Sequence, residues 1–378
     1  MDFSTLCIHG SKDRHDSTGA VSFPIFQSAT FAHPGVGQST GYDYSRDRNP
    51  TRDHLEKTLA GLEGGVDALA FASGMAAVAV LMELFKPGDH MIASDDLYGG
   101  THRYFRRICE KNGQTFSFVN TSVLSEIEAK ITPETKAVFI ETPSNPLMQV
   151  TDIAAAARLA KRHGLLLVVD NTFLTPYYQK PLELGADIVM HSGTKYLGGH
   201  NDTLAGFLTV KDPSLAERLR FLYKTIGPSL APFDSWLVIR GIKTLAVRMD
   251  RQQESALKIA EWLTTWKKVT KVYYAGLPTH PDYEISKRQA SGFGAMISFR
   301  TDSEETAVRI LQRVSLIQYA ESLGGVESLI TYPMLQTHAD VPREEREVKG
   351  VDERLLRLSV GLEHAPDLID DLKQAMEE

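Results

Sequence analysis

Short apolar runs alternate with amphipathic stretches along the chain from about residue 61 onward. Seven of these runs are predicted to be strands, and they cover Ala68–Ala72, Met91–Ser94, Thr115–Val119, Ala137–Glu141, Leu165–Asp170, Asp187–His191 and Leu204–Val210. Helical patterns lie between most of them, for example over Met75–Phe85, Thr101–Asn112 and Ile153–His163. This alternation predicts an α/β domain in which helices cover both faces of a mostly parallel sheet.

The two ends of the chain follow other patterns. The first sixty residues look irregular, whereas Ser235–Trp266 repeats apolar residues at three- and four-residue spacing and predicts a long helical segment. The tail reads as strand, strand, helix, strand and helix, over Val269–Tyr274, Ala295–Arg300, Thr306–Val314, Leu355–Val360 and Asp367–Met376. We therefore expect an N-terminal arm (1–60), an α/β domain (61–245) and a smaller α+β domain (246–378).

Composition and charge exclude several classes of protein. The 378 residues are 42% hydrophobic and 24% charged, which is typical of a folded chain rather than a disordered one. The net charge of −7 argues against binding to nucleic acid or an anionic membrane. The uncharged run over 68–82 is shorter than the roughly 20 residues that span a bilayer. With only two cysteines, Cys7 and Cys109, and no secretory signal, we expect the cytoplasm as the compartment.

Polar groups collect where three of the predicted strands end. They are Asp170, the hydroxyls of Ser192 and Thr194, Lys195, and a Ser73-Gly74 turn that opens a helix. In open α/β sheets this edge usually binds the ligand. Glycine and hydroxyls at a helix N-terminus suit a phosphate, a buried aspartate needs a cation, and a buried lysine has the lowered pKa that imine formation needs. Together the three features predict pyridoxal 5′-phosphate (PLP).

Each feature also has an ordinary explanation when it is taken alone. Asp170 could cap a helix, Lys195 could lie on the surface, and Ser73-Gly74 could be a plain turn. No Walker A or dinucleotide-binding glycine motif competes for the phosphate, and the histidines lack metal-ligand spacing, so no metal is expected.

Five motifs occur in order over essentially the whole chain. They are Tyr44-Ser45-Arg46 with Asn49-Pro50-Thr51, Asp170-Asn171-Thr172, Ser192-Gly193-Thr194-Lys195-Tyr196 with Gly199-His200-Asn201-Asp202, Glu321-Ser322-Leu323-Gly324-Gly325-Val326-Glu327-Ser328, and Arg357-Leu358-Ser359-Val360-Gly361-Leu362-Glu363. Together they resemble the Cys/Met metabolism (transsulfuration) family of PLP-dependent enzymes.

The resemblance implies fold type I of the PLP-dependent transferases and a homotetramer built from two tight dimers. Lys195 would hold the cofactor as an imine and later remove the substrate α-proton, and Tyr98, stacked on the cofactor ring, is also expected to be catalytic. The remaining cofactor contacts that it implies are Asp170 at the pyridine nitrogen, Thr172 at the ring, Gly74, Met75, Ser192 and Thr194 at the phosphate, and Tyr44 and Arg46 from the neighbouring subunit.

Arg357 lies in an otherwise apolar predicted strand of the tail. A buried arginine is rare unless it is paired, and its planar fork suits a carboxylate, so it could form either a structural ion pair or a ligand contact. The resemblance favours a clamp for the substrate α-carboxylate, helped by Asn145 and by the backbone around Ser322.

A few positions bear on which member of the family this chain resembles. Gly100 stands where methionine γ-lyases usually carry a cysteine. Glu321 and Asp43 could bind the distal ammonium of cystathionine or cysteine, and Arg103 the distal carboxylate, although Asp43 and Arg103 could equally be surface charges.

The segments 330–333 and 336–342, together with Asn201, look most like bacterial γ-synthases. We therefore expect a cystathionine γ-synthase that joins an O-acylhomoserine to cysteine. The alternatives are a cystathionine γ-lyase, and then a β-lyase, a homoserine-ester thiolase or a methionine γ-lyase. An aminotransferase or a non-catalytic relative is disfavoured, because the arm motif, Lys195 and Asp170 are all present.

Overall fold

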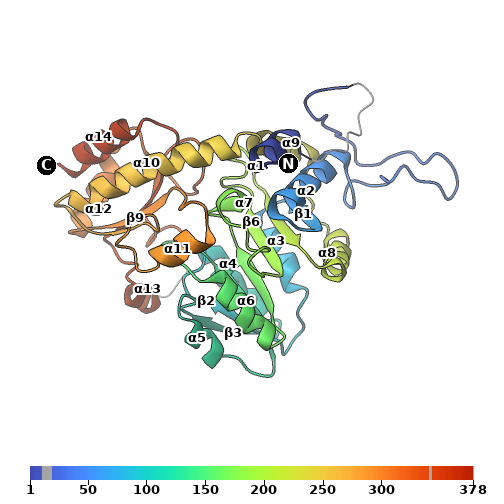
Figure 1. Cartoon of the computed structure of the whole chain (residues 1–378), viewed down its shortest axis with the longest axis horizontal. Coiled ribbons are helices and arrows are strands. Elements are labelled where there is room, and N and C mark those ends of the chain that lie inside the picture. The colour runs from blue at the N-terminus through green and yellow to red at the C-terminus, as the bar shows by residue number, and fades with distance from the viewer. Residues whose placement is uncertain (11–18, 340–342, 378) are drawn as a thin grey trace.

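The computed structural model describes residues 1–10, 19–339 and 343–377, and two sheets organise the chain (Figure 1). The larger sheet has seven strands in the order β1-β7-β6-β5-β4-β2-β3. Their bounds are β1 Asp67–Phe71, β2 His90–Ser94, β3 Thr115–Val119, β4 Thr135–Glu141, β5 Leu166–Asp170, β6 Ile188–Ser192 and β7 Gly206–Val210. All seven predicted strands are confirmed, with ends shifted by at most two residues.

The sheet is parallel from β6 to β3, whereas β7 runs antiparallel to both of its neighbours, β6 and β1. The connection from β6 to β7 contains no helix, so the chain returns beside β6 in the opposite direction. The expectation of a mostly parallel sheet therefore holds, with this one strand reversed.

Helices cover both faces of the large sheet, because its strands are apolar on both sides. One face packs against α3 (Gly74–Met82), α8 (Pro213–Ile226) and the π-helical turn η1 (Phe105–Cys109) that continues α4 (Gly99–Tyr104). The other face packs against α5 (Leu124–Ala129) and α6 (Ile153–Arg162), and the short α7 (Thr175–Tyr178) follows β5.

The tail forms a second sheet in the order β10-β11-β12-β9-β8. Its strands are β8 Val269–Tyr273, β9 Met296–Thr301, β10 Gln318–Tyr319, β11 Leu329–Thr331 and β12 Leu355–Ser359, and its helices are α11 Tyr283–Gln289, α12 Glu304–Arg313, α13 Arg343–Lys349 and α14 Ala365–Met376. The five predicted tail elements are confirmed, whereas α11, α13 and the short strands β10 and β11 were not predicted. The long helical segment is in fact two helices, α9 (Pro232–Ile242) and α10 (Leu245–Thr265).

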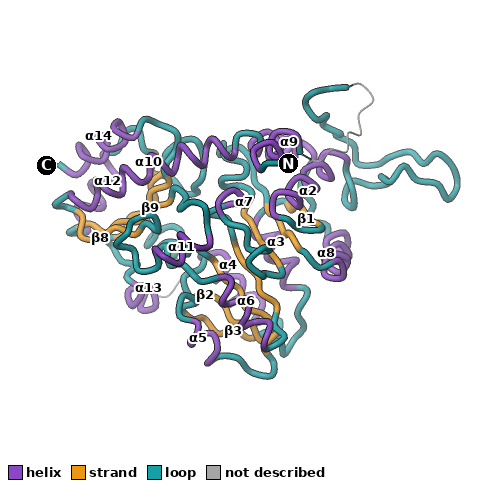
Figure 2. The backbone as a smooth tube through the Cα atoms, viewed as in Figure 1, coloured by secondary structure: helices purple, strands orange, loops and turns teal. Residues whose placement is uncertain are grey.

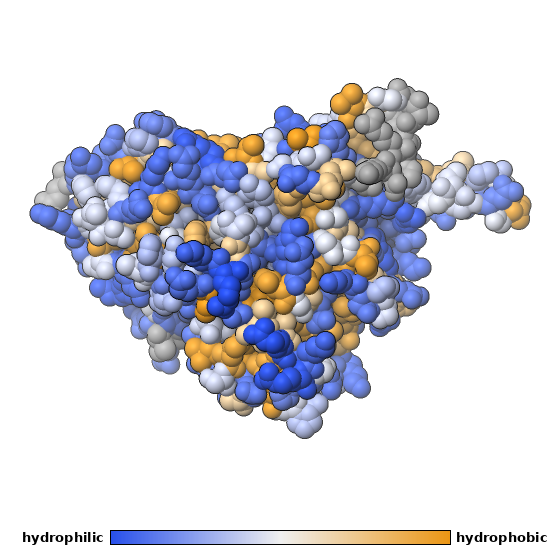
Figure 3. All heavy atoms as spheres, viewed as in Figure 1, coloured by the Kyte–Doolittle hydropathy of each residue, from blue (hydrophilic) through white to orange (hydrophobic). Residues whose placement is uncertain are grey.

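The irregular appearance of the first sixty residues is partly misleading. They contain α1 (Phe3–His9) and the start of α2 (Pro50–Glu63), and α1 packs against α2 and α10. Between these helices, the described residues 19–49 form the projecting segment, part of which extends away from the body of the molecule as a loop (Figures 1 and 2). Near its start, Phe23 stacks on His54 of α2 and its carbonyl accepts a hydrogen bond from Trp236 of α9. Figure 3 shows hydrophobic atoms at the far end of this loop. Val36, which belongs to the loop, is fully exposed.

No helix in the described part of the chain is long and apolar enough to cross a membrane. The division into parts at residues 60 and 245 stays a prediction.

Candidate active site

A cavity of about 200 Å³ opens at the carboxyl edge of the large sheet, between that sheet and the tail domain. Its walls are formed by Ser73, Gly74, Met75, Tyr98, Thr101, Asn145, Asp170, Thr172, Phe173, Met190, Ser192, Thr194, Lys195, Leu204, Glu321, Ser322, Leu323, Thr337 and Arg357. The structure thus brings together twelve of the sixteen residues proposed for the site from the sequence.

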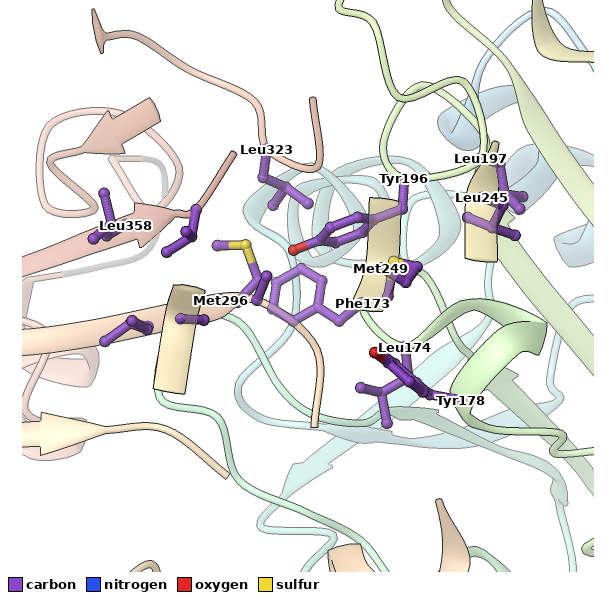
Figure 4. Close-up of a cluster of buried hydrophobic side chains, with 14 of the residues drawn as sticks. Phe173, Leu174, Tyr178, Tyr196, Leu197, Leu245, Met249, Met296, Leu323 and Leu358 are labelled. Carbon is purple, nitrogen blue, oxygen red and sulfur yellow. The ribbon is translucent and has the colours of Figure 1, made fainter. Parts of the chain in front are cut away.

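The apolar core holds this cavity in place from behind. Four of the proposed site residues are each followed directly by a residue buried in one hydrophobic cluster. These core residues are Phe173, Tyr196, Leu323 and Leu358, which follow Thr172, Lys195, Ser322 and Arg357 (Figure 4). Because interiors are close-packed, each of the four site side chains starts from a backbone that cannot shift freely.

Asp170 ends β5 and is only 7% exposed. Its Oδ1 accepts hydrogen bonds from the backbone N–H of Thr172, at 3.0 Å, and from the Thr172 hydroxyl, at 2.5 Å. Burial nevertheless raises the pKa of Asp170, although the Thr172 bonds and the charge of His191 oppose the shift. A cation placed against this carboxylate would offset the cost of its burial.

A second buried carboxylate, Glu141, lies beside Asp170 because the two residues are register partners at the ends of β4 and β5. Its Oε2 accepts the backbone N–H of Tyr98 at 2.8 Å. Burial, followed by the neighbouring Asp170 charge, raises the pKa of Glu141 well above its ordinary value. Sequence reasoning did not select Glu141, although its position at a strand end was a usable signal.

The start of α3 forms a narrow cradle. Ser73 caps the helix, with its Oγ accepting the N–H of Ala76 at 3.1 Å. A Cβ on Gly74 would lie 3.2 Å from the Cβ of Ser192, and one on Gly206 would lie 2.1 Å from the Ser73 carbonyl oxygen. Glycine is therefore required at 206, whereas a Cβ at 74 would need its neighbours to shift by a few tenths of an ångström. The first turn of α3, which is the positive end of the helix, lines the cavity.

Lys195 follows β6, and its Nζ donates a hydrogen bond to Ser322 Oγ at 2.8 Å. Burial and the nearby charge of Arg357 lower the pKa of Lys195 to about 8, while Glu321 acts in the opposite direction. Near neutral pH, part of the population therefore carries a neutral amine, which is the form that attacks an aldehyde or accepts a proton.

Arg357 lies on β12 and is 2% exposed. Its Nη1 donates to Asn145 Oδ1 at 2.8 Å, and its Nη2 donates to the Ser322 carbonyl at 3.0 Å and to Thr331 Oγ1 at 3.2 Å. Burial lowers its pKa to about 10. Among the described residues, none accepts a hydrogen bond from its buried Nε, so the guanidinium retains capacity for a carboxylate ligand.

Four of the proposed residues lie outside the cavity in this single chain. Tyr44 and Arg46 lie on the projecting segment, where Arg46 Nη1 donates to the Lys224 carbonyl at 2.6 Å. Asp43, on the same segment, accepts the Ser39 hydroxyl at 2.5 Å, and Arg103 is exposed on α4. Their proposed roles stay predictions.

Seven cavity residues were not proposed as site residues. They are Ser73, Thr101, Phe173, Met190, Leu204, Leu323 and Thr337. The alternation of β6 places Met190 on the same face as Ser192, so strand periodicity could have found it. Thr337 lies in a segment whose continuation, Asp340-Val341-Pro342, is outside the described residues.

These walls fit PLP. The cradle at Gly74 can take the phosphate, the Asp170 carboxylate can face a protonated ring nitrogen, and the Lys195 amine can take the aldehyde.

Comparison with known proteins supports this assignment. The sequence profile of the Cys/Met metabolism PLP-dependent enzymes matches residues 4–377. The chain is 52% identical to a cystathionine γ-synthase/O-acetylhomoserine (thiol)-lyase of Bacillus subtilis, over 95% of this chain and 92% of that protein. It is 50% identical to a cystathionine β-lyase of Lactococcus lactis subsp. cremoris, over 99% and 98% of the two chains.

Among solved structures, cystathionine γ-lyase of Lactobacillus plantarum, complexed with L-serine, superposes with a TM-score of 0.96 at 47% identity, over 99% of this chain and 98% of that one. This likeness confirms the PLP-dependent fold type I. The chain therefore belongs to the Cys/Met metabolism PLP-dependent enzyme family, and it is a PLP-dependent transsulfuration enzyme acting on sulfur amino acids.

Proposed function

We propose that this enzyme is a cystathionine γ-synthase, which replaces the γ-substituent of an O-acylhomoserine with the sulfur of cysteine. The three relatives described above carry three different activities, so their names do not choose among them.

The observation that carries the proposal is the position of Glu321. This exposed carboxylate lines the cavity and also a wider hollow outside it, and Leu204, 63% exposed, lies at the same junction. Three more carboxylates line the outer hollow, on Asp202, Asp234 and Glu327. The negative charge around this mouth attracts the ammonium group of an amino acid, which favours cysteine or cystathionine over sulfide as a ligand. The preference for a γ-synthase over the lyases rests on the segments 330–333 and 336–342 and on Asn201, which resemble bacterial γ-synthases.

The residues around the cavity divide the work of the reaction. Bound PLP supplies an electron sink that stabilises negative charge on the substrate Cα. Lys195 Nζ, oriented by Ser322, is placed to take and return the α-proton, and Arg357 with Asn145 holds the substrate α-carboxylate. Asp170 would hold its carboxylate against a protonated ring nitrogen, and Tyr98 lines one wall of the cavity.

Gly100 counts against a methionine γ-lyase. A Cβ at this position would lie 2.4 Å from Cε1 of Tyr98. A cysteine here would therefore require a different position of the Tyr98 ring, which borders the cavity.

We also propose a homotetramer in which each arm completes a neighbouring cavity, so that Tyr44 and Arg46 reach the cofactor phosphate and Asp43 the outer pocket of the next subunit. The projecting segment supports this arrangement, since Val21 and Val36 are 92% and 107% exposed on it. We keep the cytoplasm as the proposed compartment, because Cys7 and Cys109 are buried free thiols.

Product analysis of the purified enzyme tests the assignment. O-acetyl-, O-succinyl- and O-phosphohomoserine are each supplied with cysteine, and cystathionine is supplied separately. Formation of cystathionine supports a γ-synthase. If cysteine and 2-oxobutyrate are released from cystathionine faster than cystathionine is formed, the enzyme is a γ-lyase. If homocysteine and pyruvate are released, it is a β-lyase. Either result overturns the proposal.

A further inference from the structure

Arg52 is one of the largest fully buried side chains in the described part of the chain, at 2% exposure, and it does not line the cavity. It belongs to the first turn of α2, directly after the projecting segment. A buried guanidinium is costly unless its donors are satisfied, so its partners show what it holds together.

Those partners are backbone carbonyls on two separate segments. Arg52 Nη2 donates to the carbonyls of Ser45, at 2.5 Å, and Asp47, at 3.1 Å, which flank Arg46 on the projecting segment. Its Nη1 donates to the carbonyl of Leu230 at 3.0 Å. The closest carboxylate, on Glu56, is 3.8 Å from Nε, so the carbonyl contacts are the shorter ones.

The segment around Leu230 is hydrogen-bonded to the strand that precedes the cradle at the start of α3. The N–H of Leu230 donates to the Ala70 carbonyl of β1 at 3.0 Å, and the N–H of Ala72 donates to the Pro228 carbonyl at 2.9 Å. Ala72 directly precedes Ser73, the cap of α3. One side chain thus joins the root of the projecting segment to the support of the cradle.

We propose that Arg52 is a positioning residue that sets the direction of the projecting segment, and with it the reach of Tyr44 and Arg46 into the neighbouring subunit's cofactor site. This inference rests on the proposed role of the arm in that site. A guanidinium suits this role, because its donors diverge and reach carbonyls on two separate segments at once. A lysine ammonium donates from a single point.

The test compares Arg52→Lys, which keeps the charge and most of the stem, with Arg220→Lys as a matched control. Arg220 binds Glu56 and Asp67 in the same charge network but donates to no carbonyl of the projecting segment. We expect Arg52→Lys to raise the Kd of the apoprotein for PLP, measured by absorbance titration, about tenfold, with Arg220→Lys within about twofold of wild type. An unchanged Kd for Arg52→Lys overturns the inference.

Mixed dimers locate the defect. Arg52→Lys chains are exchanged with Lys195→Ala chains, equilibrated with limiting PLP and reduced with borohydride, and the mass of each chain is measured. Only the Arg52→Lys chain can be labelled at Lys195, in a site whose arm comes from the other chain. Recovery of wild-type labelling supports the inference, whereas persistent loss places the effect of Arg52 within its own subunit and overturns it.

Arg46→Ala taken through the same exchange separates the two proposals. If its labelling is not restored, the proposed role of the arm fails, and the Arg52 inference fails with it. If Arg46→Ala is restored but Arg52→Lys is not, only the Arg52 inference fails. Should Arg52→Lys not fold, Arg52→Gln is tested in the same way, and failure of both to fold while Arg220→Lys folds shows a structural role and overturns the inference.

Discussion

The cavity and the projecting segment are opposite kinds of functional region. The cavity is lined by side chains whose backbone is anchored in the core, and Asp170, Lys195 and Arg357 already have defined partners within one chain. The projecting segment carries Tyr44 and Arg46 away from that cavity, and Tyr44 is 50% exposed. A single chain therefore gathers most of the proposed site residues in one cavity, whereas Tyr44 and Arg46 do not line it.

This difference predicts large effects for substitutions in the cavity and smaller ones for the arm. Buried groups act in a low dielectric, with little competition from water, whereas exposed charges are screened.

Lys195→Ala is expected to have the largest effect. Removing the amine that takes the α-proton should lower kcat by at least ~10²–10⁴-fold, because general-base and covalent contributions are both lost. The fold should persist, as judged by circular dichroism and melting temperature. Turnover above a few per cent of the wild-type rate would remove Lys195 from the mechanism.

Asp170→Asn should come next, with a loss of about 10²–10³-fold in kcat and partial retention of cofactor. A neutral amide keeps the hydrogen bonds to Thr172 possible but supplies no charge opposite the ring nitrogen. Thr172→Val is the matched control, because it removes the hydroxyl and keeps the carboxylate. Wild-type steady-state rates for Asp170→Asn contradict the role given to this charge.

Glu321→Ala tests the mouth of the cavity. Losing one charge-assisted hydrogen bond to a distal ammonium should cost roughly 1.5–3 kcal/mol, or about ten- to a hundredfold, in kcat/KM for cysteine or cystathionine. Elimination from an O-acylhomoserine alone should change little. Equal losses for both substrate types mean that Glu321 only supports the loop around Ser322, and the preference for cystathionine chemistry then falls.

Arg46→Ala tests the arm directly. We expect PLP affinity to fall about tenfold, because one charged hydrogen bond to phosphate is lost at an exposed position. Mixing this variant with Lys195→Ala under subunit exchange should restore partial activity in mixed dimers. Absence of recovery, with mixed dimers verified by mass, places Arg46 outside the neighbouring site.

The smallest effect concerns pH. Because the pKa of Lys195 is lowered to about 8, its amine is mostly protonated below that pH and gains nucleophilicity as the pH rises through it. Capture of PLP by the apoprotein should therefore be about fourfold slower at pH 7.5 than on the alkaline plateau. Glu321→Gln should move the midpoint downward, because the carboxylate raises this pKa; an unchanged midpoint shows that the charge does not reach Lys195.

The helix α2 shows why the hydrophobic pattern did not predict every element of the fold. Its buried residues include Arg52, Glu56 and Glu63, so polar side chains interrupt the apolar periodicity on which a helix prediction depends. Local signals were present nonetheless, since Asn49 caps the helix, Pro50 opens it and Gly64 closes it with a φ of 74°. Buried polar residues thus remove the apolar periodicity of a helix, but the residues at its two ends still indicate where it begins and ends.

The strands and the chemistry of their ends followed from the sequence alone. A run such as Leu165–Val169 can only be satisfied inside a sheet, and parallel strands bring their carboxyl ends to one edge, where Asp170 and Lys195 had to meet. Tertiary structure decided what those groups experience: the pairing of Glu141 with Asp170, the donation from Lys195 to Ser322, and the carbonyls gathered by Arg52. A sequence pattern indicates which residues are buried. Contacts between separate segments, such as the bonds from Lys195 to Ser322 and from Arg52 to the Leu230 carbonyl, depend on how those segments pack, and no local pattern encodes that packing.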